Sequence, residues 1–194
     1  MDALDLLTGD HNRVRGLFTQ FTSAHEADDM TAAQTVVKKI IEDLEAHTTI
    51  EEEIFYPAVR PESDEINESV AEGIEEHHVV KVLIQEIRAL EPGSEQWTAK
   101  VQVMIENVEH HAEEEETEMF PAVRGETTEA EREELGQRLE ARKADLGAPT
   151  TADAEGLTKD VLIDLASEQE IPGRSTMSKE ELAATVDARA LASR

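Results

Sequence analysis

The chain has 194 residues, with 18 Lys and Arg against 45 Asp and Glu, which gives a formal net charge of −27. This charge disfavours nonspecific binding to nucleic-acid phosphates. The absence of cysteine excludes disulfides, iron–sulfur clusters and Cys-ligated zinc. No stretch has transmembrane length or the pattern of a signal peptide, so we expect a cytoplasmic protein that does not contact membranes. The length allows one good-sized domain and a small appendage.

The first expected helix runs from about residue 2 to 23, with Asp2 as its cap. His11 lies in the middle of its apolar face, among residues spaced three or four apart: Leu4, Leu7, Val14, Phe18 and Phe21. A single histidine on an apolar face is usually a hydrogen-bonded core residue. His25 follows outside this face and is interpreted as a surface residue.

The second expected helix covers about residues 31 to 55, and Thr31 with Gln34 has the spacing of a capping box. Its apolar face consists of residues at helical spacing: Ile40, Leu44, His47, Glu51 and Ile54. A carboxylate on such a face is costly unless it is paired or binds a metal. The alternative is a slightly rotated helix whose Glu side chain reaches solvent. Pro57 is expected to end the helix.

The third expected helix covers about residues 64 to 90 and carries Gly73 and His77 on its apolar face. The fourth follows the Pro92-Gly93-Ser94 turn, extends to about residue 119 and carries His111 and Glu115. His78 and His110 lie about 100° off these faces and are expected to be exposed or to contact a ligand from behind. Glu116 is a weaker ligand candidate held in reserve, whereas Glu52 and Glu114 are interpreted as surface groups.

These helices form an internal repeat. The segment from His47 to Arg60 recurs 64 residues later, from His111 to Arg124, and both copies end in Pro-Ala-Val-Arg. The first and third helices align at a shift of 66, which matches His11 with His77 and Arg15 with Lys81. The chain therefore contains two copies of a helical pair. Four histidines and two glutamates at equivalent positions favour a shared metal site over isolated core histidines.

The C-terminal part has its own helix signals. Thr128 and Glu131 form a capping box that opens an amphipathic helix through Leu135, Leu139 and Leu146, expected to pack outside the bundle. We expect a first domain over residues 1–146, a linker over 147–156 and a helix-loop-helix module over 157–194. A capping box of Ser178 and Glu181 opens the second helix of this module.

Together, a single His on helices one and three and His-x-x-x-Glu followed by Phe/Tyr-Pro on helices two and four resemble the hemerythrin-like, or HHE cation-binding, family over roughly residues 1 to 145. The resemblance implies an all-α, up-down-up-down four-helix bundle with an oxo- or hydroxo-bridged centre of two iron ions. The positions that match the family's ligands are His11, His47, Glu51, His77, His111 and Glu115.

One position departs from the oxygen-carrying members of that family, which have a second His where this chain has Gly73. Tyr56 is a candidate for the additional ligand that this change would require. On a regular helix Tyr56 would point away from Glu51, but a distortion before Pro57 could turn it inward. An aromatic plug over the end of the core is the alternative role for Tyr56.

The resemblance implies a non-haem di-iron protein that reacts with hydrogen peroxide, O2 or nitric oxide. The alternatives are an oxygen- or iron-sensing or iron-binding module without turnover, and a bundle that a metal merely stabilises. The C-terminal module resembles the Rho-N-terminal or SAP-like helix-loop-helix through Leu162, Leu165, Ala166, Ile171, Pro172-Gly173-Arg174, Met177 and Lys179-Glu180-Glu181-Leu182. Residues 150–194 contain 5 Lys and Arg against 9 Asp and Glu, so we do not expect it to bind nucleic acid. The sequence leaves the oligomeric state and the division of ligands between the two irons open.

Overall fold

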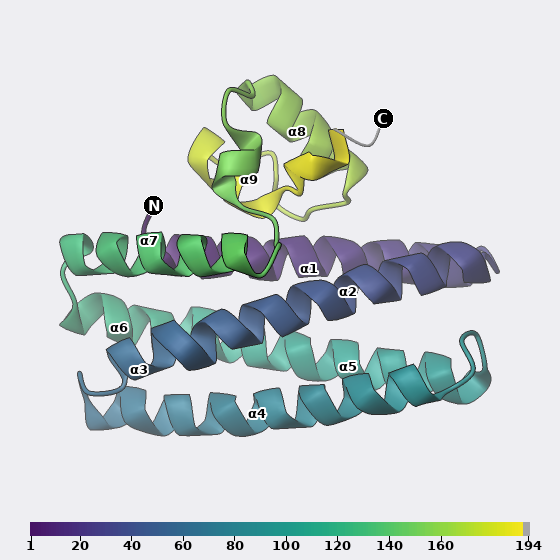
Figure 1. Ribbon diagram of the computed structural model, residues 1–194, viewed down its shortest axis with the longest axis horizontal. Helices are drawn as coiled ribbons and strands as arrows, with labels where there is room; N and C mark the ends of the chain where they lie inside the picture. The colour runs from purple at the N-terminus through teal and green to yellow at the C-terminus, as the bar shows by residue number, and fades with distance from the viewer. Residues whose placement is uncertain (192–194) are drawn as a thin grey trace.

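A computed structural model describes residues 1–191 and confirms the expected all-α fold, since no described residue is in a β-strand. Four long helices lie side by side and form the bundle (Figure 1). They are α1 (Ala3–Glu26), α2 (Met30–Ile50), α4 (Asp64–Ala89) and α5 (Glu95–Glu114). None of the described helices is long and apolar enough to cross a bilayer.

The helix starts follow from side chains that accept hydrogen bonds from free backbone N–H groups. Asp2 accepts from the N–H of Leu4 at 2.9 Å, which confirms the predicted cap of α1. The prediction that Thr31 and Gln34 open α2 is wrong. Asp29 is the N-cap instead, and its carboxylate accepts from the N–H of Ala32, so the helix begins one residue before Thr31.

The predicted helix end before Pro57 is also wrong, because the chain remains helical through the proline. A five-residue π-helix, η1 (Glu51–Phe55), leads directly into the short helix α3 (Tyr56–Val59). The second repeat does the same with η2 (Glu115–Met119) and α6 (Phe120–Glu126). A wider π turn accommodates a proline that cannot donate to the helix ladder, and such turns are frequent at functional sites.

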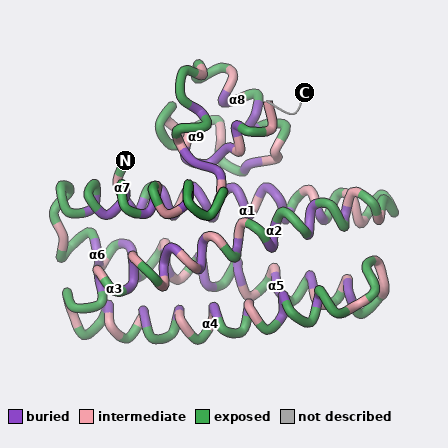
Figure 2. Tube along the Cα trace, in the orientation of Figure 1, coloured by how far each residue is buried: buried purple, intermediate pink, exposed green. Residues whose placement is uncertain are grey.

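The apolar core is divided into two clusters along the bundle. One fills the end near the α4–α5 turn and includes Phe21, Ile40, Ile84 and Trp97. The other fills the end with the π segments and includes Leu7, Ile50, Phe55, Val70 and Phe120. Buried residues lie on the inward faces of all four helices (Figure 2). The four histidines of the apolar faces lie between the two clusters.

The helix α7 (Glu129–Asp145) packs along α1 and α2, with Leu135 and Leu139 buried in the second apolar cluster. Its N-terminus has the predicted capping box of Thr128 and Glu131. Leu146 lies just past the helix end and is 38% exposed, so it does not extend the packed face as expected.

Residues 148–191 form a small module with its own apolar core. The segment expected to be a linker contributes to it: the short 3-10 helix η3 (Thr151–Ala154) places Ala154 in that core. The linker is therefore shorter than residues 147–156. The remaining elements are α8 (Lys159–Glu168), α9 (Lys179–Thr185), opened by the predicted capping box, and η4 (Ala188–Leu191).

The module lies against α1 beside α7, mainly through α9 (Figure 1). The approach is close, because a Cβ on Gly16 of α1 would lie 2.5 Å from the carbonyl oxygen of Gln169. Arg13 of α1 is buried at this contact and donates to the carbonyl of Ala184 at 3.3 Å. The module is thus joined to the same helix that carries His11.

Candidate metal centre

The six residues that the repeat singled out converge inside the bundle. Their potential donor atoms form two groups in which all atoms lie within 4.8 Å of one another. The first group contains His11, His47, Glu51 and Glu115, and the second contains Glu51, His77 and His111. All six side chains are buried, so the alternative in which Glu51 and Glu115 reach solvent is wrong.

The first group joins α1 and α2 to both π segments. The Nε2 atoms of His11 and His47 lie 3.2 Å apart. Oε2 of Glu51 lies 3.2 Å from Nε2 of His47, and Oε2 of Glu115 lies 3.3 Å from Nε2 of His11. His11 therefore groups with His47, a division that the sequence had left open.

The second group lies on the other side of Glu51. Nε2 of His77 lies 3.1 Å from Nε2 of His111 and 3.3 Å from Oε2 of Glu51. Glu115 is also near, with its Oε2 3.7 Å from Nε2 of His111. Glu51 thus reaches histidines of both groups, as does Glu115 through His11 and His111. The two glutamates therefore connect the two donor groups.

The donor set fits divalent cations. Both carboxylate oxygens of Glu51 and Oε2 of Glu115 accept no hydrogen bond, although the two side chains are 0% and 2% exposed. A buried carboxylate without partners carries a large desolvation cost, which coordination to a cation offsets. Imidazole and carboxylate ligands without thiolate suit iron, manganese or zinc.

Burial and mutual proximity also perturb the pKa values of these groups. Burial and the neighbouring Glu115 carboxylate raise the pKa of Glu51 well above its usual range. Burial opposes charge on His11, but the Glu115 carboxylate 3.3 Å away and the hydrogen bond to Glu116 raise the pKa of His11 to about 9. Burial lowers the pKa of His47 to about 4. Without a cation, His11 therefore carries a proton near neutral pH, and Glu51 keeps a proton to higher pH than an exposed glutamate does.

A second layer of carboxylates orients the histidine rings, a role that was not predicted from the sequence. Nδ1–H of His11 donates to Oε1 of Glu116 at 2.8 Å, and Arg15 also donates to Glu116. Glu116 therefore lies behind His11, not among the inner donor atoms. A carboxylate at Nδ1 fixes the tautomer that leaves Nε2 free to bind a metal.

The same arrangement recurs in the other half of the molecule. Nδ1–H of His77 donates to Glu52 at 3.0 Å, and Lys81 donates to both oxygens of Glu52. The interpretation of Glu52 as a surface group is therefore wrong. Glu52 and Glu116 correspond at the shift of 64, and Arg15 and Lys81 at 66. This repeated pairing was the signal that could have identified both glutamates.

The remaining two histidines face Asp10 and Glu76, which also correspond at the shift of 66. Nδ1–H of His111 donates to Glu76 at 2.7 Å, whereas Nδ1 of His47 lies 3.7 Å from Asp10. Asp10 is held by Lys143 at 2.5 Å and by Arg13 at 2.7 Å. The two halves therefore differ here, since Asp10 belongs to a buried ion cluster that Glu76 lacks.

The side chain of Tyr56 points into the bundle, toward the histidines and glutamates of the site. A role as a metal ligand requires this orientation. Its hydroxyl donates to Oε1 of Glu115 at 2.9 Å and lies 3.5 Å from Nε2 of His77. The cause is the π turn, in which the N–H of Tyr56 donates to the carbonyl of Glu51, five residues earlier. Residues five apart then lie near the same face. A Cβ on Gly73 would lie 2.9 Å from the Tyr56 hydroxyl, so the glycine makes room for it.

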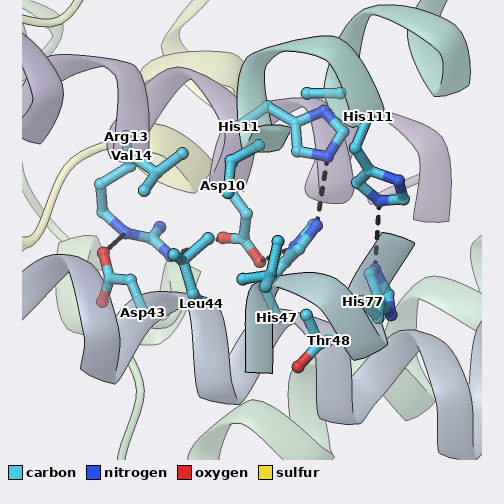
Figure 3. A pocket seen from close by; sticks show the side chains of 13 residues that line it. Asp10, His11, Arg13, Val14, Asp43, Leu44, His47, Thr48, His77 and His111 are labelled. Carbon is cyan, nitrogen blue, oxygen red and sulfur yellow. Dashed lines mark hydrogen bonds and ion pairs between the residues drawn. The ribbon is translucent and has the colours of Figure 1, made fainter. Parts of the chain in front are cut away.

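A small, mostly apolar cavity adjoins the histidines on the side of the first core cluster (Figure 3). Its walls include Val14, Leu44, Val80 and Val108, and the rings of the four central histidines also line it. Figure 3 shows the close pairs His11–His47 and His77–His111 and, to one side, Arg13 with Asp43. Such a cavity suits a small, weakly polar molecule.

The other three histidines lie outside the centre. His78 is exposed, and His110 is 65% exposed, 3.3 Å from Glu114. His25 is partly buried, not fully on the surface as expected, because its ring stacks on Phe21 with centroids 6.0 Å apart.

Comparison with known proteins gives the family. A curated relative from Nostoc sp. (strain PCC 7120 / SAG 25.82 / UTEX 2576), named a DNA nickase, is 29% identical over 144 residues, which are 74% of this chain and 40% of the relative. The chain thus spans less than half the length of that relative. No solved structure matches the chain. Residues 2–123, more than half of the chain, match the family model of the hemerythrin HHE cation binding domain. The chain therefore belongs to the hemerythrin HHE cation-binding domain family.

Proposed function

We propose that the protein binds two iron ions in the bundle and reacts there with a small oxidant: hydrogen peroxide, O2 or nitric oxide. The observation that carries the proposal is the pair of buried donor groups that share Glu51. His11 and His47 would hold one ion, and His77 and His111 the other. Glu51 and Glu115, which lie near histidines of both groups, would contribute to holding both ions. A redox-active metal pair would supply the chemistry by which one hydrogen peroxide molecule is reduced to water while a second is oxidised to O2, whereas turnover of O2 or nitric oxide would also need an external electron donor.

The chain's own residues have separable parts in this proposal. Glu52 and Glu116 hold Nδ1 protons of His77 and His11, which keeps both Nε2 atoms directed inward. The apolar walls of the cavity in Figure 3 limit water at the histidines while admitting a small neutral molecule. Gly73 replaces the second His of the oxygen-carrying members, which makes reversible O2 carriage a weaker candidate than turnover.

Tyr56 is proposed as an additional ligand. Its hydroxyl lies near Glu115 and His77, in the space that a side chain at position 73 would fill. A phenolate bound to Fe(III) gives a strong visible absorption band. Loss of that band in Tyr56→Phe, with two irons per chain retained, supports ligation. An unchanged spectrum in this variant refutes it and leaves Tyr56 as a hydrogen-bond donor.

Metal analysis and a visible spectrum of the purified protein test the main proposal first, with two irons per chain expected. Gas release on addition of peroxide then tests turnover. His47→Ala should remove both iron and gas release, whereas His78→Ala, which changes an exposed histidine, should retain both. Absence of iron uptake refutes the metal centre. Iron-loaded protein that is no faster than free iron refutes the turnover.

A second candidate function is sensing of iron or O2, with the C-terminal module as the output. Arg13 favours a sensing role because it links the site to the module. It donates hydrogen bonds to Asp10, which lies beside His47, and to the carbonyl of Ala184 in the module. Sensing predicts that iron loading changes the rate of proteolysis within residues 147–191. Equal cleavage of loaded and unloaded protein refutes it.

The name of the cyanobacterial relative does not supply a third candidate. The net charge of −27 disfavours contact with DNA phosphates, and residues 150–194 contain more acidic than basic side chains. We therefore do not include nucleic acid among the proposed partners.

A further inference from the structure

An acidic hollow opens on the surface between α4 and the second π segment, on the side of the bundle away from α7. Its rim carries four glutamates, Glu72, Glu76, Glu114 and Glu118. His111 and Glu115 lie at its inner end. The hollow therefore leads from solvent to the second donor group of the metal centre.

Gly73 lines the inner end of the hollow, next to Tyr56 and His111. A Cβ at this position would lie 2.9 Å from the Tyr56 hydroxyl and 3.4 Å from Cε1 of His111. Glu115 lines the same hollow at 2% exposure, and its Oε2 has no hydrogen-bond partner. A buried carboxylate oxygen without a hydrogen bond, at the end of an acidic hollow, indicates a path for a cation.

At the mouth, three side chains form a further group that could hold a cation: Glu76, His110 and Glu114. Nε2 of His110 lies 3.3 Å from Glu114 and 4.0 Å from Oε1 of Glu76. The other oxygen of Glu76 accepts from Nδ1–H of His111 at 2.7 Å. Glu76 therefore contacts both the exposed group and a histidine of the buried centre.

The internal repeat shows that these residues are not a general property of the helices. Four of these positions are apolar in the first repeat, namely Leu6 for Glu72, Ala46 for His110, Ile50 for Glu114 and Ile54 for Glu118, whereas Glu76 corresponds to Asp10. There, Leu6 and Ile50 are buried in the cluster that α7 covers. One half of the bundle is closed by apolar packing, and the other half is acidic and open.

We propose that this hollow is the route by which divalent cations reach the buried centre, with Glu76, His110 and Glu114 as a transient binding site at its mouth. The proposal rests on the proposed function in requiring that the centre takes up metal. An imidazole and two carboxylates bind divalent cations, and the exposure of His110 allows rapid release. The surrounding glutamates raise the local concentration of cations through their summed field.

The test is the rate of Co2+ uptake by the full chain, followed by stopped-flow absorbance of the Co2+ bands. The variant H110A/E114Q removes two groups from the mouth and leaves the six inner residues intact. The control H78A/E113Q makes the same substitutions at exposed positions that lie outside the hollow. Both variants lower the negative charge equally. A difference in their rates of Co2+ uptake would therefore be due to the position of the substituted residues.

We expect H110A/E114Q to take up Co2+ roughly tenfold more slowly than the control, at an unchanged final content of two ions per chain. We also expect added salt to slow uptake by the control more than by the variant, because steering by charge is screened. Equal rates for the two variants would overturn the proposal. A lower final content in H110A/E114Q would also overturn it, since these residues would then belong to the centre itself. If even the unaltered protein takes up no Co2+, the proposed metal centre fails instead.

Discussion

The hydroxyl of Tyr56 lies 2.9 Å from the position that a Cβ on Gly73 would occupy. The two residues come from different repeats of the helical pair. The inward orientation of Tyr56 requires that position 73 has no side chain. The tyrosine points inward because a π turn precedes it, and the glycine leaves the space that the tyrosine hydroxyl fills.

This relationship predicts that Gly73→Ala destabilises the protein even though Gly73 lies inside a helix. Alanine in a helix normally stabilises relative to glycine, by about 0.5–1 kcal/mol. Here the new methyl displaces the Tyr56 hydroxyl, and such overpacking costs about 1–3 kcal/mol. In a Tyr56→Phe background the oxygen is absent, so the same substitution should no longer destabilise and should show the usual gain of about 0.5–1 kcal/mol. Urea unfolding of the four proteins without metal measures the coupling. A stabilising Gly73→Ala in the unaltered background would contradict it.

Removal of a carboxylate behind a histidine should weaken metal binding without removing an inner donor. Glu52→Gln and Glu116→Gln each leave the histidine Nδ1 without its charged acceptor, and we expect metal affinity to fall about 10–100-fold. Competition with a chelator measures the affinity. Glu113→Gln changes an exposed neighbour and is the control. Affinity equal to that of the control would show that these carboxylates do not orient the rings.

Metal binding should release protons and strengthen as the pH rises. The pKa of His11 is raised to about 9, so His11 is protonated near pH 7 before a cation binds, and the raised pKa of Glu51 lets it keep a proton to higher pH than an exposed glutamate does. A cation must displace these protons, so its apparent affinity rises with pH until about pH 9 and falls on acidification. Titration with Zn2+ from about pH 6.5 to 8.5, with proton release followed by an indicator dye, tests this. Affinity independent of pH would contradict it.

Arg13 should stabilise both the bundle and the docked module. It is 5% exposed, and its guanidinium donates to Asp10, Asp43 and the carbonyl of Ala184. Arg13→Ala leaves buried carboxylates with fewer partners, which typically costs about 3–5 kcal/mol. Chemical denaturation measures this cost, and limited proteolysis should show faster cleavage near residues 147–158.

The control for this prediction is Arg138→Ala, which changes an exposed arginine of α7 and should alter stability by less than about 0.5 kcal/mol. Cleavage at the same rate in both variants would show that Arg13 does not hold the module on α1.

The sequence by itself determined the helical architecture and the positions at which the inner residues occur. Helical periodicity and caps depend on neighbours along the chain, so spacing alone places His47 and Glu51 on one buried face. The repeat then supplies the equivalent pair, His111 and Glu115. The exact first residue of a helix was determined less well, because Asp29, and not Thr31, is the N-cap of α2.

Only the tertiary structure decided which groups meet across helices. Three examples are the pairing of His11 with His47, the hydrogen bond from His77 to Glu52 and the inward orientation of Tyr56. Each depends on the angle and register at which separate helices pack, or on a π turn that shifts the register after Glu51. Sequence spacing defines one face of one helix. It does not define the distance between faces, and that distance determines whether six polar side chains can share a pair of cations.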